Sequence, residues 1–367
     1  MVLFLLTAAV QLFAGGVPQA KRGVVIVQNG NFIMEGGVVS GFTDKDGGYG
    51  VFVTGSASRF TMSGGVITGD STAATTGSGV YVSAGGTFTM SDTAIISGNT
   101  ASSGGGVVVT GSGSSFSMSG GKIIDNTVKG DGGGGVYVGN NGTFTMSNNA
   151  VISGNSAAFN YGGGGVLVTG NGSSFSMSGG NISGNSSTGA SSGGGGVHVR
   201  GAGSKFEMSG GNIGGTLTGT ANNATSGGGV CVAASGIFNL NGGNISGNVS
   251  TGTSSGGGGV YVDDSSNFFM NNGTISGNTA TNYGGGVYVF GSGIFKKEPA
   301  DGNNTSGIIT GYGDDTVTGN VVKDSADTIL SDRGHAVYVS DSMYKDTTVT
   351  TAMDLDTTED GEAGGGE

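Results

Sequence analysis

Several residue types are scarce in this 367-residue chain, and each scarcity excludes a class of protein. There are two prolines and glycine does not recur at every third position, which excludes collagen. The single cysteine, Cys231, cannot form an internal disulfide. Only 10% of the residues are charged, and no basic patch exists that could contact a phosphate backbone. We therefore expect no binding of nucleic acid.

Glycine, in contrast, is abundant, with 84 residues. A chain rich in glycine and serine often remains disordered because it cannot bury enough apolar surface. Here, however, the hydrophobic residues, 35% of the chain, fall at regular positions. Five phenylalanines lie 28 residues from one another, namely Phe32, Phe60, Phe88, Phe116 and Phe144. This spacing favours a folded array of repeats.

Three short apolar motifs recur in each repeat. The first is a glycine run followed by an apolar triplet, as in Val136–Val138; the second is F-x-M, as in Phe144–Met146; the third is isoleucine before S-G-N, as in 152–155. Each motif alternates with a period of two, which is typical of a β-strand. Phe144 and Met146 therefore share one face, and Thr145 lies on the other.

Three such strands in roughly 30 residues predict one triangular coil of a parallel β-solenoid, in which equivalent strands pair at about 4.8 Å. Glycines at the corners are expected to supply positive φ. A lone coil cannot fold, because ordering its residues costs several times the ~10 kcal/mol that about five buried side chains contribute. We predict an all-β fold of about 10 stacked coils, each of 27–33 residues and three short strands.

The chain divides into four predicted regions. Residues 1–22 are an apolar leader or an N-terminal cap, 23–297 are regular repeats, 298–345 are an irregular terminal coil, and 346–367 are an acidic, disordered tail. Residues 2–14 have the length of a signal-peptide core, but Lys21 and Arg22 follow this core instead of preceding it. A cleaved signal, a cap and a piece of a longer protein therefore all remain possible interpretations.

The acidic end and the loops carry two further expectations. The net charge of −12 arises entirely within 298–367, and we expect this repulsion to discourage end-to-end stacking, so that deletion of 298–367 would promote oligomers. Extra residues enter the repeats at one turn, before the valine triplet. The loops 156–161, 186–192 and 249–255 should therefore line one edge, which in solenoids is often the edge that binds.

The outward residues of the valine triplets form a partly aromatic stripe. They include Phe52, Tyr81, Tyr137, Tyr261, Tyr288 and Tyr338. Such a stripe can stabilise the sheet through contacts between neighbouring strands. It can also remain exposed and bind the faces of sugars or a partner protein, and we take it as the candidate binding site. His198 and Cys231 occupy this position in adjacent coils, and we interpret them as members of a surface stripe, not as a metal or nucleophilic pair.

No catalytic, cofactor or metal site is predicted, because the acidic residues of the repeats are scattered as in solvated turns. The asparagines of S-G-N are interpreted as a structural ladder along the axis, formed by Asn99, Asn126, Asn155, Asn185, Asn248, Asn278 and Asn320. An outward array of Thr and Ser, as at Thr61 and Thr89, resembles the array of ice-binding solenoids but decays at Glu207 in later coils.

The run S-G-N-T-A…G-G-G-V-Y-V at 276–289 resembles the repeats of bacterial polymorphic outer-membrane proteins and related adhesins. The resemblance extends over roughly residues 23–340, although isoleucine stands where that family often has phenylalanine. The segment from Gly334 onward is similar to the close of glycine-rich repeat proteins of spirochaetes.

This resemblance implies a right-handed parallel β-helix that is secreted or attached to the bacterial cell surface. It implies an adhesin or envelope component without catalytic activity, whose partner is a glycan or a host matrix protein. A polysaccharide-active β-helix enzyme and a pure structural spacer remain the alternatives. We expect a monomer without a transmembrane span.

Overall fold

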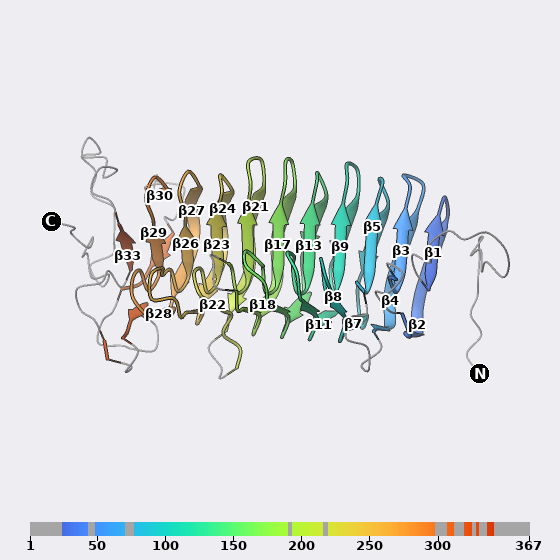
Figure 1. Cartoon of the computed structure of the whole chain (residues 1–367), viewed down its shortest axis with the longest axis horizontal. Helices are drawn as coiled ribbons and strands as arrows, with labels where there is room; N and C mark the ends of the chain where they lie inside the picture. The colour runs from blue at the N-terminus through green and yellow to red at the C-terminus, as the bar shows by residue number, and fades with distance from the viewer. Residues whose placement is uncertain are drawn as a thin grey trace.

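The structure is a computed structural model that describes residues 24–42, 48–69, 77–189, 193–215, 219–297, 307–311, 319–324, 328–329 and 336–340. These residues form an elongated rod of stacked coils, with blue N-terminal strands at one end and red C-terminal strands at the other (Figure 1). The predicted leader 1–22 and the acidic tail 346–367 lie outside the described residues, as does most of 298–345.

The strands form three parallel sheets, each running along the rod (Figure 1). Sheet A has 11 strands and contains the valine triplets. Its strands are β1 (Val25–Gln28), β3 (Val51–Thr54), β5 (Val80–Ser83), β9 (Val107–Thr110), β13 (Val136–Gly139), β17 (Val166–Thr169), β20 (Val197–Arg200), β23 (Val230–Ala233), β26 (Val260–Val262), β29 (Val287–Val289) and β33 (Val337–Val339).

Sheet B has 14 strands and contains both the F-x-M motif and the isoleucine motif. Its strands are β2 (Asn31–Val39), β4 (Arg59–Thr68), β6 (Thr87–Met90), β7 (Ile95–Ser97), β10 (Ser115–Met118), β11 (Lys122–Ile124), β14 (Thr143–Met146), β15 (Val151–Ser153), β18 (Ser174–Ser183), β21 (Lys205–Gly214), β24 (Ile237–Ser246), β27 (Asn267–Ser276), β30 (Ile294–Lys297) and β31 (Ile308–Ile309).

Sheet C has eight strands of two residues each, directly after the ladder asparagines. They are β8 (Thr100–Ala101), β12 (Thr127–Val128), β16 (Ser156–Ala157), β19 (Ser186–Ser187), β22 (Asn223–Ala224), β25 (Val249–Ser250), β28 (Thr279–Ala280) and β32 (Val321–Val322). The parallel β-solenoid is thus confirmed, and its number of coils is close to the ten predicted. No helix occurs in the described ranges.

The division of each coil into strands differs from the prediction of three separate strands. The F-x-M and isoleucine motifs lie in one sheet, and in β18 they form one continuous strand whose register shifts after Met177. In the coil of β6 and β7 the chain breaks between the motifs, where Asp92 has a φ of 51°. Sheet C forms the third side, and its two-residue strands are too short to show a period-two pattern.

The core is a set of columns of identical side chains. From Phe60 to Phe268, successive phenylalanine rings stack with centroids 4.6–4.8 Å apart and planes within 9° of parallel. Phe144 and Met146 are 1% exposed, whereas Thr145 between them is exposed. The predicted inward and outward faces are therefore confirmed.

The asparagine ladder is also present and contains one more member than predicted. The Oδ1 atom of Asn155 accepts hydrogen bonds from the backbone N and the Nδ2 of Asn126, both at 3.0 Å. Its own Nδ2 donates to Ile123 O at 3.0 Å and to Asn185 Oδ1 at 2.9 Å. Asn222 continues the ladder in a coil that lacks the S-G-N motif, since Asn185 donates to it at 3.0 Å. Each rung satisfies polar groups that are fully buried.

In the glycine runs before the valine triplets, glycine allows neighbouring backbones to pack closely. We had expected glycine at the corners only to supply positive φ. A Cβ on Gly135 would lie 2.7 Å from Gly165 O of the next coil. Its φ is not positive, in contrast to Gly154 in the S-G-N turn, whose φ is 67°. The expectation of positive φ therefore holds at the S-G-N corner. In the run before sheet A, Gly135 is required because neighbouring backbones approach too closely for a side chain, while Gly257 and Gly284 of later runs also have positive φ, of 78° and 58°.

Candidate functional site

The outward stripe of sheet A is more buried than the sequence led us to expect. Phe52, Tyr261 and Tyr288 are 8%, 4% and 3% exposed, and Tyr81, Tyr137 and Tyr338 are half-buried. The cause is the glycine-rich turn before each sheet A strand, which lies against the outer face of that sheet. A Cβ on Gly104, for example, would lie 2.5 Å from Val108 Cγ2. The prediction of an exposed stripe is thus wrong for its buried members.

Ring contacts group the aromatic residues of the stripe toward its two ends. Near the N-terminal end, Tyr49 stacks on Tyr81 with centroids 4.5 Å apart. Near the C-terminal end, Tyr283 lies 4.7 Å from Tyr338 and 5.6 Å from Tyr288. The contacts between Tyr261 and Tyr288 and between Tyr288 and Tyr338 are consistent with cross-strand stabilisation.

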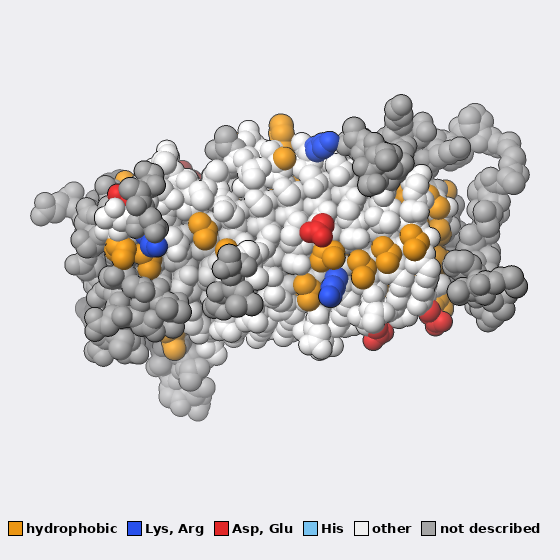
Figure 2. All heavy atoms as spheres, turned by 90° about the horizontal axis from the view of Figure 1, so that it is seen from below, with side chains coloured by type: hydrophobic (Ala, Val, Ile, Leu, Met, Phe, Trp, Pro, Cys, Tyr) orange, Lys and Arg blue, Asp and Glu red, His pale blue; other side chains and the backbone are white. Residues whose placement is uncertain are grey.

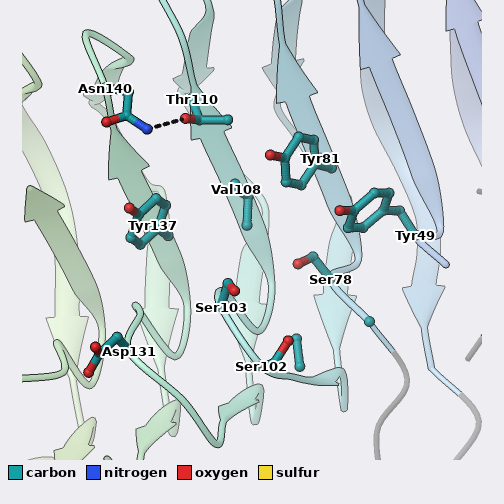
Figure 3. A pocket seen from close by; sticks show the side chains of 12 residues that line it. Tyr49, Ser78, Tyr81, Ser102, Ser103, Val108, Thr110, Asp131, Tyr137 and Asn140 are labelled. Carbon is teal, nitrogen blue, oxygen red and sulfur yellow. Dashed lines mark hydrogen bonds between the residues drawn. The ribbon is translucent and has the colours of Figure 1, made fainter. Parts of the chain in front are cut away.

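A shallow pocket of about 280 Å³ opens on the stripe between Tyr81 and Tyr137 (Figure 3). Val108 lies between the two tyrosines in the strand register, since it pairs with Tyr81 on one side and with Tyr137 on the other. Its small side chain leaves a gap that spans two strand spacings, or about 10 Å. We call this site the tyrosine pocket.

Gly139, at the end of β13, gives Tyr137 the space for its orientation. A Cβ on Gly139 would lie 2.6 Å from Tyr137 Cε1 and 2.7 Å from its hydroxyl oxygen, so the ring lies across this glycine. The neighbouring strands carry Thr110 and Thr169 at the same register position. The φ of Gly139 is not positive, so its backbone does not need glycine. The glycine therefore makes room for the phenol.

The rim of the tyrosine pocket is polar and carries one charge. Ser102, Ser103 and Asp131 line one side, and on the other Asn140 Nδ2 donates to Thr110 Oγ1 at 3.3 Å (Figure 3). Burial raises the pKa of Tyr137, and the nearby Tyr81 and Asp131 raise it further, while Arg200 lowers it. The Tyr137 hydroxyl therefore stays protonated and can donate a hydrogen bond to a ligand oxygen.

The sequence identified Tyr81 and Tyr137 but missed the rest of the tyrosine pocket. Tyr49 and Asp131 lie in the turns before sheet A strands, outside the strand pattern, and nothing in the repeat indicated that these turns contact the stripe. Gly139 was the one available signal, because it replaces the threonine of neighbouring repeats after V-x-V.

His198 and Cys231 are register partners in β20 and β23, as their spacing predicted, but both side chains are fully buried. Their interpretation as surface residues is therefore wrong. Burial raises the pKa of the Cys231 thiol, and it lowers the pKa of His198 to about 4, with Arg200 lowering it further. The pair thus consists of a neutral thiol and a neutral imidazole at pH 7. In the described part of the chain, no three His, Cys, Asp or Glu side chains are grouped to hold a metal ion.

Comparison with known proteins supports the fold. Residues 19–179 match the family model described as "Right handed beta helix region". No curated protein matches the chain, and no solved structure does. Among the described residues there is also no helix of the length and apolarity that crossing a membrane requires. The architecture of the coils and this match together show that the chain folds as a right-handed parallel β-helix.

Proposed function

We propose that this protein is a non-catalytic, secreted or surface-attached β-helix protein that binds a glycan in the tyrosine pocket, as an adhesin or cell-envelope component. The observation that carries the proposal is the gap between Tyr81 and Tyr137 above Val108. Two half-buried phenols flank Val108, which is itself 2% exposed at the base of the gap, and hydroxyl, amide and carboxylate groups surround the gap.

This combination of groups suits a sugar. Aromatic rings pack against the apolar C–H face of a pyranose, and the sugar hydroxyls need donors and acceptors at the edge of the contact. Ser102, Ser103 and Asn140 supply such groups on both sides of the tyrosine pocket. Asp131 is its one charged lining residue, so a neutral sugar or an amino sugar is favoured over an acidic one.

The composition of the rod surface is consistent with a role outside the cell. On the face shown in Figure 2, few charged side chains are visible, most of the described surface is uncharged, and hydrophobic side chains form a row along part of the rod. Such a surface does not attract nucleic acid. The apolar segment 2–14 and the resemblance to bacterial surface repeats also support a location outside the cell. Bacterial origin, secretion and envelope attachment are part of this proposal.

The proposal is tested with the full chain on an array of neutral and amino-sugar oligosaccharides. We expect micromolar to millimolar binding, and at least a tenfold loss in Tyr81→Ala and Tyr137→Ala. Gly139→Ala should also weaken binding, because its methyl group displaces the Tyr137 ring without removing it. Tyr338→Ala is the matched control, since it removes a half-buried tyrosine of the same stripe far from the tyrosine pocket.

Three outcomes would contradict the proposal. If the intact protein binds no glycan, a structural spacer becomes the better interpretation. If a bound oligosaccharide is cleaved, the protein is a polysaccharide-active enzyme. Equal binding by Tyr81→Ala and the intact chain would place the glycan site elsewhere on the rod.

A further inference from the structure

The turn that follows β16 displays two aromatic side chains to solvent. Phe159 is 49% exposed and Tyr161 is 42% exposed, and only Asn160 separates them. They are the most exposed aromatic side chains among the described residues. Exposed aromatic residues held close together mark a binding surface more often than isolated ones do.

Tyr161 adopts a backbone conformation that a bulky residue rarely takes. Its φ is 64°, in the left-handed region, where the side chain crowds its own backbone. Such a conformation persists only when the surrounding structure imposes it, and it is concentrated at functional sites. A glycine would adopt it without strain, and glycine is the commonest residue of this chain.

The next coil holds this turn in place at three points. The Nδ1–H group of the fully buried His198 donates to Tyr161 O at 2.9 Å. The guanidinium carbon of Arg200 lies 4.5 Å from the centroid of the Tyr161 ring. Gly189 passes so close to the turn that a Cβ on it would lie 2.4 Å from Phe159 O. The two rings are therefore presented on a rigid support.

Arg200 adds a positive charge to this surface. Its side chain is half-exposed at the end of β20, and within the described ranges no carboxylate lies within ion-pairing distance of it. Because the Tyr161 ring covers one face of the guanidinium, its N–H edges remain suited to a carboxylate, which they bind in a two-pronged geometry. An aromatic surface next to a guanidinium fits a ligand with an apolar C–H face and an acid group.

We propose that Phe159, Tyr161 and Arg200 form a binding subsite for a carboxylate-bearing sugar, such as a uronic acid residue of a glycan. The subsite shares no lining residue with the tyrosine pocket, although Arg200 lies close enough to Tyr137 to lower its pKa. The charged lining residue of the pocket is Asp131, whereas that of the subsite is Arg200. It does not depend on the function proposed for the pocket.

The experiment measures binding of an unsulfated glucuronate-containing oligosaccharide to the full chain by calorimetry. The matched ligand is its carboxyl-reduced form, in which each acid is a primary alcohol. We expect the acidic form to bind at least tenfold more tightly than the reduced form, with an affinity that falls as salt is raised. Arg200→Thr introduces the residue type that the neighbouring strand carries at the same register position, Thr169. This variant should bind the acidic and the reduced form equally.

The variant Tyr161→Gly distinguishes a role of the Tyr161 ring in binding from a role in stabilising the fold. Glycine relieves the left-handed conformation but removes the ring, so we expect loss of the acidic ligand without a lower melting temperature. Equal binding of both oligosaccharide forms by the intact chain would overturn the proposal, as would unchanged binding by Arg200→Thr. Binding of a polyglutamate peptide as tightly as the sugar would show an acidic peptide surface instead, and would also overturn it. Tyr81→Ala should not affect this ligand, which keeps the test independent of the tyrosine pocket.

Discussion

Phe144 and Phe175 stack with ring centroids 4.6 Å apart and planes 9° from parallel. They are 31 residues apart in the chain, whereas Phe116 and Phe144, which stack equally well, are 28 apart. The three additional residues are spread over the coil: one lies between Phe144 and Asn155, one in the turn between Asn155 and Val166, and one between Val166 and Phe175. The phenylalanine column thus keeps its spacing although each of the three segments that connect its members varies in length by one residue.

The column should make Phe144 far more important for stability than its neighbour. We expect Phe144→Ala to lower the free energy of unfolding by about 3–5 kcal/mol, since it opens a cavity between two stacked rings. Thr145→Ala, on the exposed face, should cost under about 0.5 kcal/mol. Denaturant unfolding followed by circular dichroism measures both. Equally mild effects would contradict the assignment of the two faces.

The solenoid should tolerate additional residues in the variable turn before sheet A, but not within the strands that carry the phenylalanine column. Two residues added between Thr253 and Ser254, which are both exposed, should change the unfolding free energy by less than about 1 kcal/mol, because lengthening a loop costs little entropy. One residue added between Phe238 and Asn239 would turn Leu240 outward and should prevent cooperative folding. Melting curves of the two variants provide the comparison, and similar curves would refute it.

Removing one asparagine side chain from the ladder should strongly lower the free energy of unfolding. Asn155→Ala leaves the buried donors of Asn126 without their acceptor, and it also removes the bonds to Ile123 O and Asn185 Oδ1. We expect a loss of about 3 kcal/mol or more in the free energy of unfolding. Asn244→Ala is the control, because that amide is exposed and its Nδ2 donates to Asn212 Oδ1 at the surface of the rod. A loss no larger than that of the control would show that the ladder contributes little.

His198 should make stability depend on pH in a defined window. Its pKa is about 4 in the folded chain and 6.5 as the ordinary value. The unfolded chain therefore binds a proton as pH falls below 6.5 while the folded chain does not, and stability decreases until about pH 4, by up to about 3 kcal/mol. Above pH 6.5 the imidazole is neutral in both states and contributes no pH dependence.

The control for this prediction is His198→Leu, which carries the residue found at Leu167 in the same position of β17. Carboxyl groups also titrate near pH 4, so the measured quantity is the difference between the melting temperatures of the two proteins from pH 7 to pH 4. This difference should shift in favour of the leucine variant as pH falls. A constant difference would mean that the pKa of His198 is the same in the folded and unfolded states.

The repeat allowed much of the fold to be predicted from the sequence. Phe144 and Met146 mark the core because alternation in a strand has only two faces, and one register alone buries both side chains. Sheet C escaped prediction because Ser156–Ala157 is too short to show alternation. Asn222 was not predicted because its own coil lacks S-G-N, and only its hydrogen bond with Asn185 places it in the ladder.

The tyrosine pocket was half predicted, for a similar physical reason. Tyr81 and Tyr137 belong to the alternating strand pattern, so the sequence predicted that their side chains point away from the core. The exposed fraction of these two side chains could not be predicted from the sequence, because it depends on the turns that carry Tyr49 and Asp131 and on how closely these turns approach sheet A. Contacts between irregular segments leave no period in the sequence.

Each strand of sheet A pairs only with its equivalents one coil before and one coil after. In evolutionary terms, duplication or loss of the DNA for one repeat would lengthen or shorten the rod by one strand spacing, about 4.8 Å, without requiring a new kind of contact. The tyrosine pocket needs Tyr81, Val108 and Tyr137 in that order, together with Tyr49 from the turn of the coil before. A cassette of four neighbouring repeats is therefore the smallest unit that could be copied to a new position with this lining intact.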